Sequence, residues 1–334
     1  MADTSTQHSG MLFIGGTGRS GTTIFKRVLQ QHSQVAGVPE FRITVDPGGL
    51  LDFYTTFKHD WTPFLYDQRL RLLKKTLMKA ASSNPLAPYY RYALKKSGLA
   101  FNRIAKLESR YTAIGLQTYN PKYREQVDAL LDNLADISYQ ASWTGLDFAA
   151  SPVLGYSEIS SIDSLATLLG DFYRNVINEI CRRQQAHYFV DDNTWNTLYF
   201  DSILELLPEA KLVHIYRDPR DVVASYMQQI WAPSDPVQAA RFYAGIMNQW
   251  WSKKQHLPGN SYLELSLEEL VNSSNDSIKQ ITEFWELPFE ETLLSTDLSR
   301  SNSNRWKRDI PDTKKREVMQ ILDPFIEKLG YANN

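Results

Sequence analysis

Two short runs of apolar residues, each followed at once by a turn, stand out in the hydrophobic pattern of this chain. The first run covers residues 11–14, and the second covers residues 211–216. Apolar runs of this length are typical of strands that are buried on both faces of a parallel sheet. After the first run, Ile24, Val28 and Leu29 recur at helical spacing. The pattern predicts a strand, a loop and a helix in succession.

The second apolar run leads into a predicted helix start. Asp218 caps exposed N–H groups and Pro219 suits the first helical position. Arg217 is therefore expected at the carboxyl end of a strand, with Ser225 about two turns into the next helix. Open α/β sheets bind ligands at that edge, and a guanidinium with a nearby hydroxyl suits a phosphate. The alternative is a local ion pair between Arg217 and an aspartate such as Asp221.

The pattern predicts a largely helical insertion in the middle of the chain, over roughly residues 50–185. Its clearest helical segments are residues 121–140 and 157–183. Residues 69–110 hold eleven Lys or Arg against one acidic residue, whereas residues 128–179 hold eight Asp or Glu against one Arg. We interpret these charges as solvated helix faces, because Leu70, Leu73 and Leu77 repeat at core spacing. The alternative is a basic groove that steers an acidic peptide, a sulfated glycan or an anionic lipid surface towards the site.

Composition narrows the class of protein. A chain of 334 residues with 43% hydrophobic residues can form a single α/β domain, preceded by a flexible N-terminus over residues 1–10. The net charge of −2 predicts no nucleic-acid partner. No stretch approaches the roughly 18 apolar residues of a membrane span, so we expect a soluble, cytoplasmic protein. The histidines show no metal-ligand spacing, and the lone Cys181 fits a packing role.

A glycine-rich loop of the phosphate-binding type follows the first strand. Residues 16–23 read GTGRSGTT, with Gly16 and Gly21 at the spacing of a Walker loop. Thr22 stands where such a loop has its lysine, and the cation is instead Arg19, three residues earlier. This arrangement favours a nucleotide with a short 5′ anionic group over a triphosphate. The alternative is a turn that only connects the strand to the helix.

These motifs resemble the sulfotransferases that use 3′-phosphoadenosine-5′-phosphosulfate (PAPS). In that family a P-[KR]-S-G-T-T loop holds the 5′-phosphosulfate, and an arginine and a serine eight positions apart hold the 3′-phosphate. This chain has GRSGTT at residues 18–23 and the Arg217 and Ser225 pair. Residues 39–43, PEFRI, and the stretch from Arg305 to Tyr331 resemble tyrosylprotein sulfotransferases more closely.

The resemblance implies a fold, a donor and a set of site residues. The fold is a P-loop-type parallel sheet flanked by helices, and the donor is PAPS, with no metal. Glu40 is the implied catalytic base, with Arg42 beside it at the acceptor and Arg19 at the leaving oxygen. The implied donor contacts are Arg19, Ser20, Gly21, Thr22, Thr23, Arg217, Ser225 and Arg305. The acceptor carries a hydroxyl group, on a peptide tyrosine, a carbohydrate or a small alcohol or phenol.

One departure from the family pattern and one likeness to another class of enzyme leave alternatives open. The family often has a lysine where this chain has DNTW at residues 192–195, so Asn193 or a neighbour replaces a cation. The preceding strand ends in Asp191 and Asp192, which resembles the acidic strand end of a Mg²⁺-dependent kinase or NTPase. A nucleotide-binding protein without catalysis is a further alternative. His32 and His59 are alternatives to Glu40 as the base. The sequence does not indicate the oligomeric state.

Overall fold

The computed structural model describes residues 10–39, 41–82, 115–140, 153–159, 161–298 and 303–331. These residues form two compact units that alternate along the chain. Unit 1 contains Ala36–His187 and Ser202–Pro208, and unit 2 contains Gly10–Val35, Tyr188–Asp201 and Glu209–Asn334. The assignment of the chain to a single domain stays a prediction.

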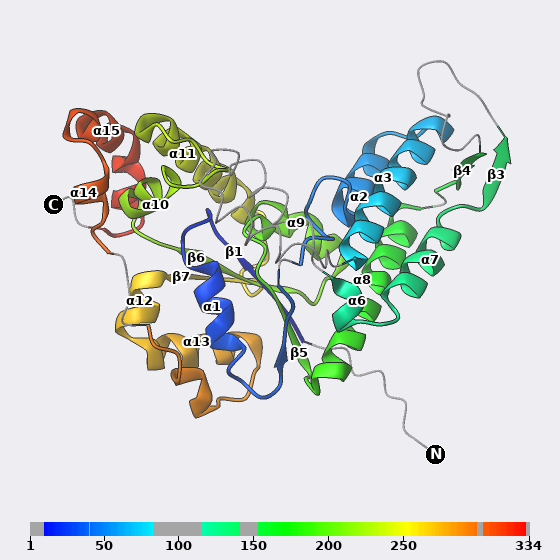
Figure 1. Ribbon diagram of the computed structural model, residues 1–334, viewed down its shortest axis with the longest axis horizontal. Helices are drawn as coiled ribbons and strands as arrows, with labels where there is room; N and C mark the ends of the chain where they lie inside the picture. Colours follow the sequence, from blue (N-terminus) through cyan, green and yellow to red (C-terminus); the bar gives the residue numbers. More distant parts are fainter. Residues whose placement is uncertain are drawn as a thin grey trace, which may run out of the picture. The chain divides into compact units, whose positions relative to one another are not determined.

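Unit 2 is built around a parallel sheet, which confirms the predicted fold class. The strand order is β2 (Val35–Ala36), β5 (Tyr188–Asp191), β1 (Gly10–Gly15), β6 (Lys211–Tyr216) and β7 (Tyr262–Ser266). The strands β5, β1, β6 and β7 pair in parallel. Strand β1 thus lies between β5 and β6 (Figure 1). Because the strands are parallel, the segments that follow β5, β1 and β6 all leave the sheet at one edge.

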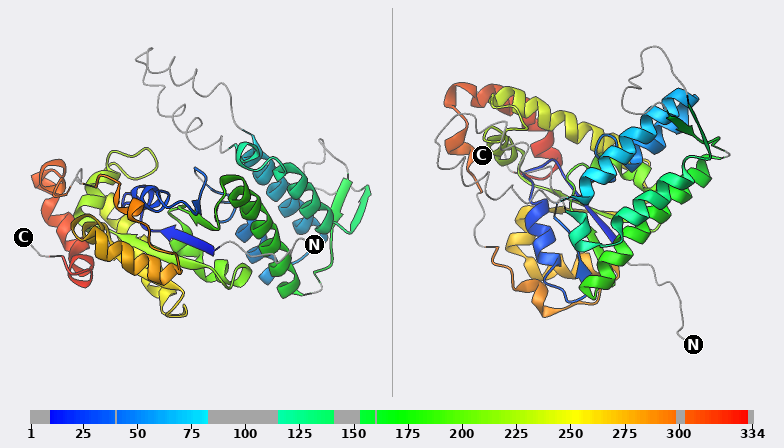
Figure 2. Two further views of the ribbon diagram at one scale, coloured as in Figure 1. Left: turned by 90° about the horizontal axis from the view of Figure 1, so that it is seen from below. Right: turned by 45° about the vertical axis from the view of Figure 1, so that its right-hand side comes forward.

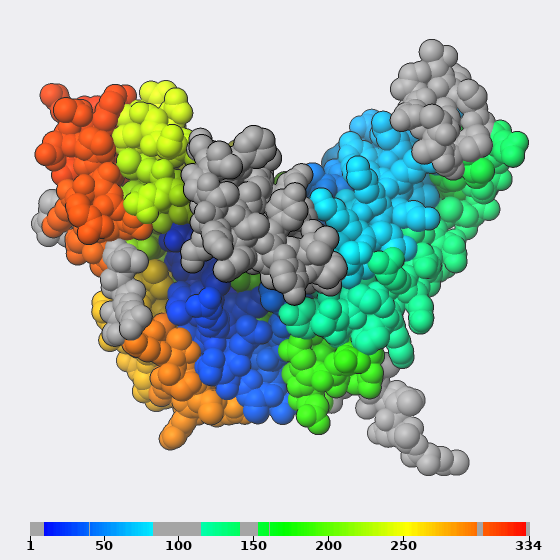
Figure 3. Space-filling model, in the orientation of Figure 1, coloured from blue at the N-terminus to red at the C-terminus, as the bar shows by residue number. Residues whose placement is uncertain are grey.

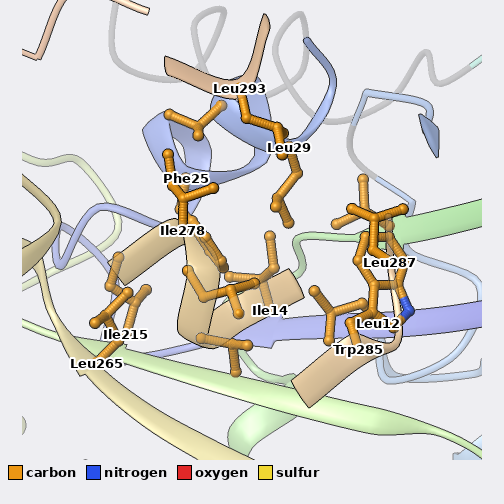
Figure 4. Close-up of a cluster of buried hydrophobic side chains, with 14 of the residues drawn as sticks. Leu12, Ile14, Phe25, Leu29, Ile215, Leu265, Ile278, Trp285, Leu287 and Leu293 are labelled. Carbon is orange, nitrogen blue, oxygen red and sulfur yellow. The ribbon is translucent and has the colours of Figure 1, made fainter. Parts of the chain in front are cut away.

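One face of this sheet is covered by three helices, α1 (Thr22–Leu29), α12 (Leu267–Asn272) and α13 (Ser274–Trp285). Val28 and Leu29 of α1 are buried, as their helical spacing predicts, whereas Ile24 is only partly buried. Phe25, next to Ile24, is fully buried. The three buried residues pack with Ile278 and other apolar residues in the cluster of Figure 4. Burial of a large apolar side chain contributes about 1.5–3 kcal/mol. This packing therefore holds α1, and the loop before it, firmly on the sheet.

Further helices of unit 2 are α10 (Pro219–Tyr226), α11 (Pro236–Lys254), α14 (Trp306–Asp309) and α15 (Asp312–Lys328), with a 3-10 turn η1 (Glu291–Leu294). Helices α11 and α15 lie side by side, yellow-green and orange in Figure 3. Tyr243 and Phe325 join them, with ring centroids 5.7 Å apart. His214 of β6 is buried against Trp250 of α11, with ring centroids 4.8 Å apart.

Unit 1 is largely helical where it is described. Its helices are α2 (Leu50–His59), α3 (Pro63–Ala81), α6 (Leu116–Tyr119), α7 (Tyr123–Asn133) and α8 (Ile162–Gln184). Helix α7 lies against both α3 and α8, teal between cyan and green in the right-hand view of Figure 2. The Thr62 hydroxyl caps α3 by accepting from the N–H of Leu65 at 3.1 Å. Helix α9 (Asn196–Leu206) begins in unit 2 and ends in unit 1.

The predicted helix over residues 121–140 was wrong at its carboxyl end. Helix α7 ends at Asn133, and β3 (Ile137–Gln140) then pairs in antiparallel fashion with β4 (Val153–Tyr156). Ile137 and Tyr139 alternate with Ser138 and Gln140, which is the period of a strand. The second predicted segment begins later than expected, because the Ser161 hydroxyl caps α8.

Helix α3 carries the part of the basic stretch that the structure describes. Leu73 and Leu77 are buried, whereas Lys74 and Lys75 are exposed. For α3, this agrees with the interpretation of a solvated charged face. The predictions for residues 1–9 and 83–114 lie outside the described residues. None of the described helices combines the length and the apolar character that a bilayer crossing requires. Cys181 of α8 is buried, as expected.

Candidate functional site

Three segments meet at one edge of the unit 2 sheet, and each follows a strand. They are residues 16–21 after β1, residues 192–195 after β5 and residues 217–218 after β6. The N–H of Gly16 donates to the carbonyl of Thr194 at 3.1 Å. The side-chain amide of Asn196 donates to the carbonyl of Ile14 and to Asp191 Oδ1, both at 3.2 Å. The segments after β1 and β5 are therefore joined directly.

The loop over residues 16–21 is shaped by left-handed backbone conformations. Gly18, Arg19 and Gly21 have φ values of 76°, 63° and 109°. Turns of this kind point successive N–H groups into an anion-binding concavity. Gly21 is the N-cap of α1, and no side chain caps this helix start. The N–H groups at the start of α1 thus face the loop, where an anion would accept hydrogen bonds from them.

Ser20 adds a polar atom to this loop. Its side chain is fully buried, and its Oγ has no hydrogen-bond partner among the described residues. A buried hydroxyl without a partner costs free energy, so such an atom is usually explained by a ligand or a water. The predicted donor contacts Thr22 and Thr23 begin α1 at the same place. The residues present therefore fit a bound phosphate or sulfate group.

Packing leaves no room for side chains at two loop glycines. A Cβ atom on Gly18 would lie 2.7 Å from Cη2 of Trp231, and one on Gly21 would lie 2.8 Å from Cδ1 of Leu267. The hydroxyl of Tyr226 in α10 donates to the carbonyl of Thr17. The loop is therefore held from α10, α12 and the segment after α10, as well as from the sheet.

Arg19 and Ser225 are brought together by the fold. Arg19 Nε donates to Ser225 Oγ at 2.9 Å, across 206 positions of sequence. Arg19 is exposed, whereas Ser225 is 1% exposed in α10. The residue predicted at the 5′ group and the residue predicted at the 3′-phosphate are thus direct neighbours in unit 2.

Arg217 lies at the end of β6, as predicted, and is buried. Its Nη2 donates to Asp221 Oδ2 at 3.3 Å, so the local ion pair considered above is also present. Asp218 caps α10 by accepting from the N–H of Arg220 at 2.9 Å. The predicted helix start at Asp218 and Pro219 is confirmed.

Arg305 stands immediately before α14, where it serves as the N-cap residue. Its Nε and Nη2 donate to Asp309 Oδ2 at 2.8 and 2.7 Å. The neighbouring Trp306 is buried, with the Arg220 guanidinium 4.9 Å from its ring centroid. Trp306 therefore has the buried position that is common for tryptophan.

Asp191 occupies the position that resembles the acid of a kinase. It is fully buried at the end of β5, and its Oδ1 accepts from the N–H of Asn193 at 3.0 Å. Burial raises the pKa of Asp191 to about 7, although hydrogen bonds from Asn193 and Asn196 oppose this. The following Asp192 pairs with Lys26 of α1 at 2.7 Å. Among the described residues, no group of three or more His, Cys, Asp or Glu side chains could hold a metal ion.

Sequence reasoning missed two contributors to this site. Lys26 is a buried cation on an otherwise apolar face of α1, and that position was the only signal of its pairing with Asp192. Asp221 accepts from the N–H groups of Asn304 and Trp306, at 2.8 and 3.1 Å. In the sequence, Asp221 lies four residues after Arg217, and this spacing indicated only the local ion pair between them.

Four residues were predicted to lie at the acceptor or considered as the base, namely Arg42, Glu40, His32 and His59. Arg42 belongs to unit 1, where its Nε contacts Asp46 Oδ2 at 2.5 Å. Glu40 lies outside the described residues. His32 is buried beyond the end of α1 that is remote from the loop, and its ring contacts the Pro288 carbonyl at 2.8 Å. This position does not suit a base at the loop. His59 ends α2 in unit 1.

A parallel sheet whose central strand leads through a glycine-rich loop into a helix defines a P-loop-type α/β protein. The model of the sulfotransferase family matches residues 12–139 and 142–291, and the chain belongs to this family. The expected family is thus confirmed. The closer likeness to tyrosylprotein sulfotransferases stays a prediction.

Individual relatives are distant. An uncharacterized protein of Aquifex aeolicus (strain VF5) is 30% identical over 173 residues, which cover 42% of this chain and 22% of that protein. The sulfotransferase domain of the Synechococcus PCC 7002 olefin synthase has a TM-score of 0.51 at 16% identity, over 100% of this chain and 99% of that domain. The sulfotransferase domain of the curacin biosynthetic pathway has a TM-score of 0.49 at 15% identity, over 97% and 98%. The olefin synthase domain shows that the two proteins share a fold.

Proposed function

We propose that this chain transfers the sulfuryl group of PAPS to a hydroxyl acceptor. The observation that carries the proposal is the 2.9 Å contact between Arg19 of the loop and Ser225 of α10. A nucleotide with anionic groups on both its 5′ and 3′ oxygens needs two adjacent anion sites. Membership of the sulfotransferase family supports this assignment of the donor.

Each end of the donor has its own set of residues in this proposal. The start of α1, with Ser20, Gly21, Thr22 and Thr23, holds the 5′-phosphosulfate through N–H and hydroxyl donors. Arg217 and Ser225 hold the 3′-phosphate, because a guanidinium matches phosphate oxygens with paired donors. Arg305 contributes a further cation near the phosphates.

In the proposed reaction, the bond between sulfur and the phosphate oxygen breaks while a bond from sulfur to the acceptor oxygen forms. Glu40 takes the proton of the acceptor hydroxyl, and Arg42 helps to orient the acceptor. Arg19 stabilises the negative charge that develops on the leaving phosphate oxygen. Positioning and electrostatics then supply most of the rate enhancement, by analogy with phosphoryl transfer. The leaving group carries fewer charges than the tail of ATP, so no metal is proposed.

Calorimetry with two nucleotides tests the donor. We expect adenosine 3′,5′-bisphosphate to bind the chain with or without EDTA, and Mg-ATP to bind much more weakly. Tight binding of Mg-ATP together with indifference to adenosine 3′,5′-bisphosphate would instead establish the kinase alternative. A screen with labelled PAPS against peptide tyrosines, carbohydrates and small alcohols or phenols then identifies the acceptor. Under the non-catalytic alternative, the bisphosphate binds but no acceptor becomes labelled, and Glu40→Gln changes nothing.

A further inference from the structure

We infer that Asp221 is a positioning residue for the 3′-phosphate, because it joins Arg217 to the segment that carries Arg305. The inference rests on the proposed function and extends it to a residue that does not itself touch the donor. The three groups that Asp221 joins all lie in unit 2.

The side chain of Asp221 is the centre of a small network. Its Oδ2 accepts from Arg217 Nη2 at 3.3 Å and from the N–H of Asn304 at 2.8 Å. Its Oδ1 accepts from the N–H of Trp306 at 3.1 Å. Asn304 and Trp306 flank Arg305 in the chain, so one carboxylate fixes the backbone on both sides of that arginine. The two backbone contacts span 83 and 85 positions of sequence.

A second contact holds the same segment on α10. The ring of Trp306 lies against the guanidinium of Arg220, 4.9 Å from its centroid. Arg220 is in turn held by Asp218, with Nη2 to Oδ2 at 2.7 Å and Nε to Oδ1 at 2.9 Å. All of these side chains are buried. The segment over residues 303–309 is therefore attached to the helix that carries Ser225.

Because the network is buried, the bond between Asp221 and Arg217 is little weakened by competing water. Asp221 is 1% exposed, and its bond to Arg217 joins two charged groups away from water. Hydrogen bonds to charged groups in such places are stronger than those between neutral groups. A guanidinium has five N–H donors, so a bond to Asp221 and bonds to a phosphate are compatible. Asp221 thus directs one of the Arg217 donors, the N–H at Nη2, in a fixed orientation.

If Asp221 has this role, its removal should weaken the preference for one phosphate position on the ribose over another. A well-oriented guanidinium favours a phosphate on the 3′ oxygen of the ribose over one on the 2′ oxygen. When the carboxylate is removed, Arg217 keeps its charge but loses the hydrogen bond that directs its Nη2. General attraction to a bisphosphate then remains, whereas the preference for one position falls.

The experiment measures two ligands on three proteins by calorimetry. The wild-type chain, Asp221→Asn and the control Asp312→Asn are each titrated with adenosine 3′,5′-bisphosphate and adenosine 2′,5′-bisphosphate. We expect Asp221→Asn to lower the affinity ratio between the two ligands by about tenfold, which corresponds to the loss of one charge-assisted bond. The control removes an exposed ion pair with Lys315, 2.6 Å long, and should keep the wild-type ratio.

Each outcome decides between the two proposals. If the wild-type chain binds neither bisphosphate, the proposed donor is wrong. If the wild-type chain prefers the 3′,5′ isomer and Asp221→Asn keeps the same ratio, Asp221 has no positioning role. An equal loss for both ligands likewise overturns the inference, since that result reports structural damage alone. Should Asp221→Asn fail to fold, Asp221→Glu decides: it keeps the charge but displaces the carboxylate, so the ratio should also fall, and a wild-type ratio overturns the inference.

Discussion

Arg19 has a backbone conformation that is unusual for a residue with a side chain. Its φ of 63° lies in the left-handed region, where an L-residue pays about 1–2 kcal/mol. Strain of this kind persists where the surroundings hold the residue in place, and it gathers at functional sites. Here Gly18 precedes Arg19, and Ser225 accepts a hydrogen bond from its side chain at 2.9 Å. The conformation directs the cationic side chain of Arg19 across the loop. Glycine would adopt this conformation more easily, but it has no side chain to supply the charge.

Substitution of the two arginines should separate catalysis from donor binding. Asparagine tolerates the left-handed region, so Arg19→Asn removes the cation with little backbone strain. If Arg19 stabilises the leaving oxygen, kcat should fall by roughly 10²–10³-fold while the KM for PAPS changes little. Arg217→Ala should instead raise the KM for PAPS by about tenfold or more. Steady-state kinetics with an acceptor from the labelled-PAPS screen gives both values, and the reversed pattern contradicts these roles.

At the scale of the element, the glycine loop depends on backbone conformation as well as on space. Gly21 has a φ of 109°, and a Cβ atom added to it would lie 2.8 Å from Cδ1 of Leu267. It is also the N-cap of α1, so its conformation sets where the helical N–H groups point. A side chain at this position would disturb the predicted anion site and the packing of α12 together.

A matched pair of glycine substitutions tests this dependence. Gly21→Ala should lower the free energy of unfolding by about 1–2 kcal/mol or more, because alanine is strained at this φ. Gly245 lies inside α11, and a methyl group there would meet no atom of the described residues beyond its own helix backbone within 4 Å. Gly245→Ala should therefore stabilise the chain by roughly 0.5–1 kcal/mol. Urea denaturation measures both changes. Equal effects of the two substitutions would show that the loop conformation is not required for stability.

The elements around the site could be predicted because their signals are local. The strands β1 and β6 follow from short apolar runs, and the start of α10 follows from Asp218 and Pro219. The strand β3 was missed because four residues, alternating apolar and polar, are too few to compete with the helical pattern of α7 before them. Contacts such as Arg19 with Ser225 depend on the order of strands in the sheet, which no local pattern encodes.

At the scale of the whole molecule, two buried titratable groups of unit 2 make the stability depend on pH in opposite directions. Burial lowers the pKa of His214 from 6.5, although a hydrogen bond to Glu264 opposes this. Stability is therefore lost as the pH falls below the unfolded value and His214 must accept a proton. Burial raises the pKa of Asp191 from 3.8 to about 7. The folded state thus holds a proton that the unfolded state releases, and stability is lost as the pH rises from about 4 to 7.

Asp191→Asn isolates the second effect, because the amide has no charge to bury. Its oxygen can still accept from the N–H of Asn193, so the turn after β5 should survive. Relative to the wild-type chain, the variant should gain on the order of 2 kcal/mol in free energy of unfolding between pH 5 and pH 8. Asp192→Asn is the control: it breaks the ion pair with Lys26 and should destabilise the chain similarly at both pH values. Urea denaturation at pH 5 and 8 gives each difference. If the wild-type chain and Asp191→Asn respond equally to pH, Asp191 is ionised in the folded state, and its charge must then be neutralised by the nearby Lys26 or by solvent.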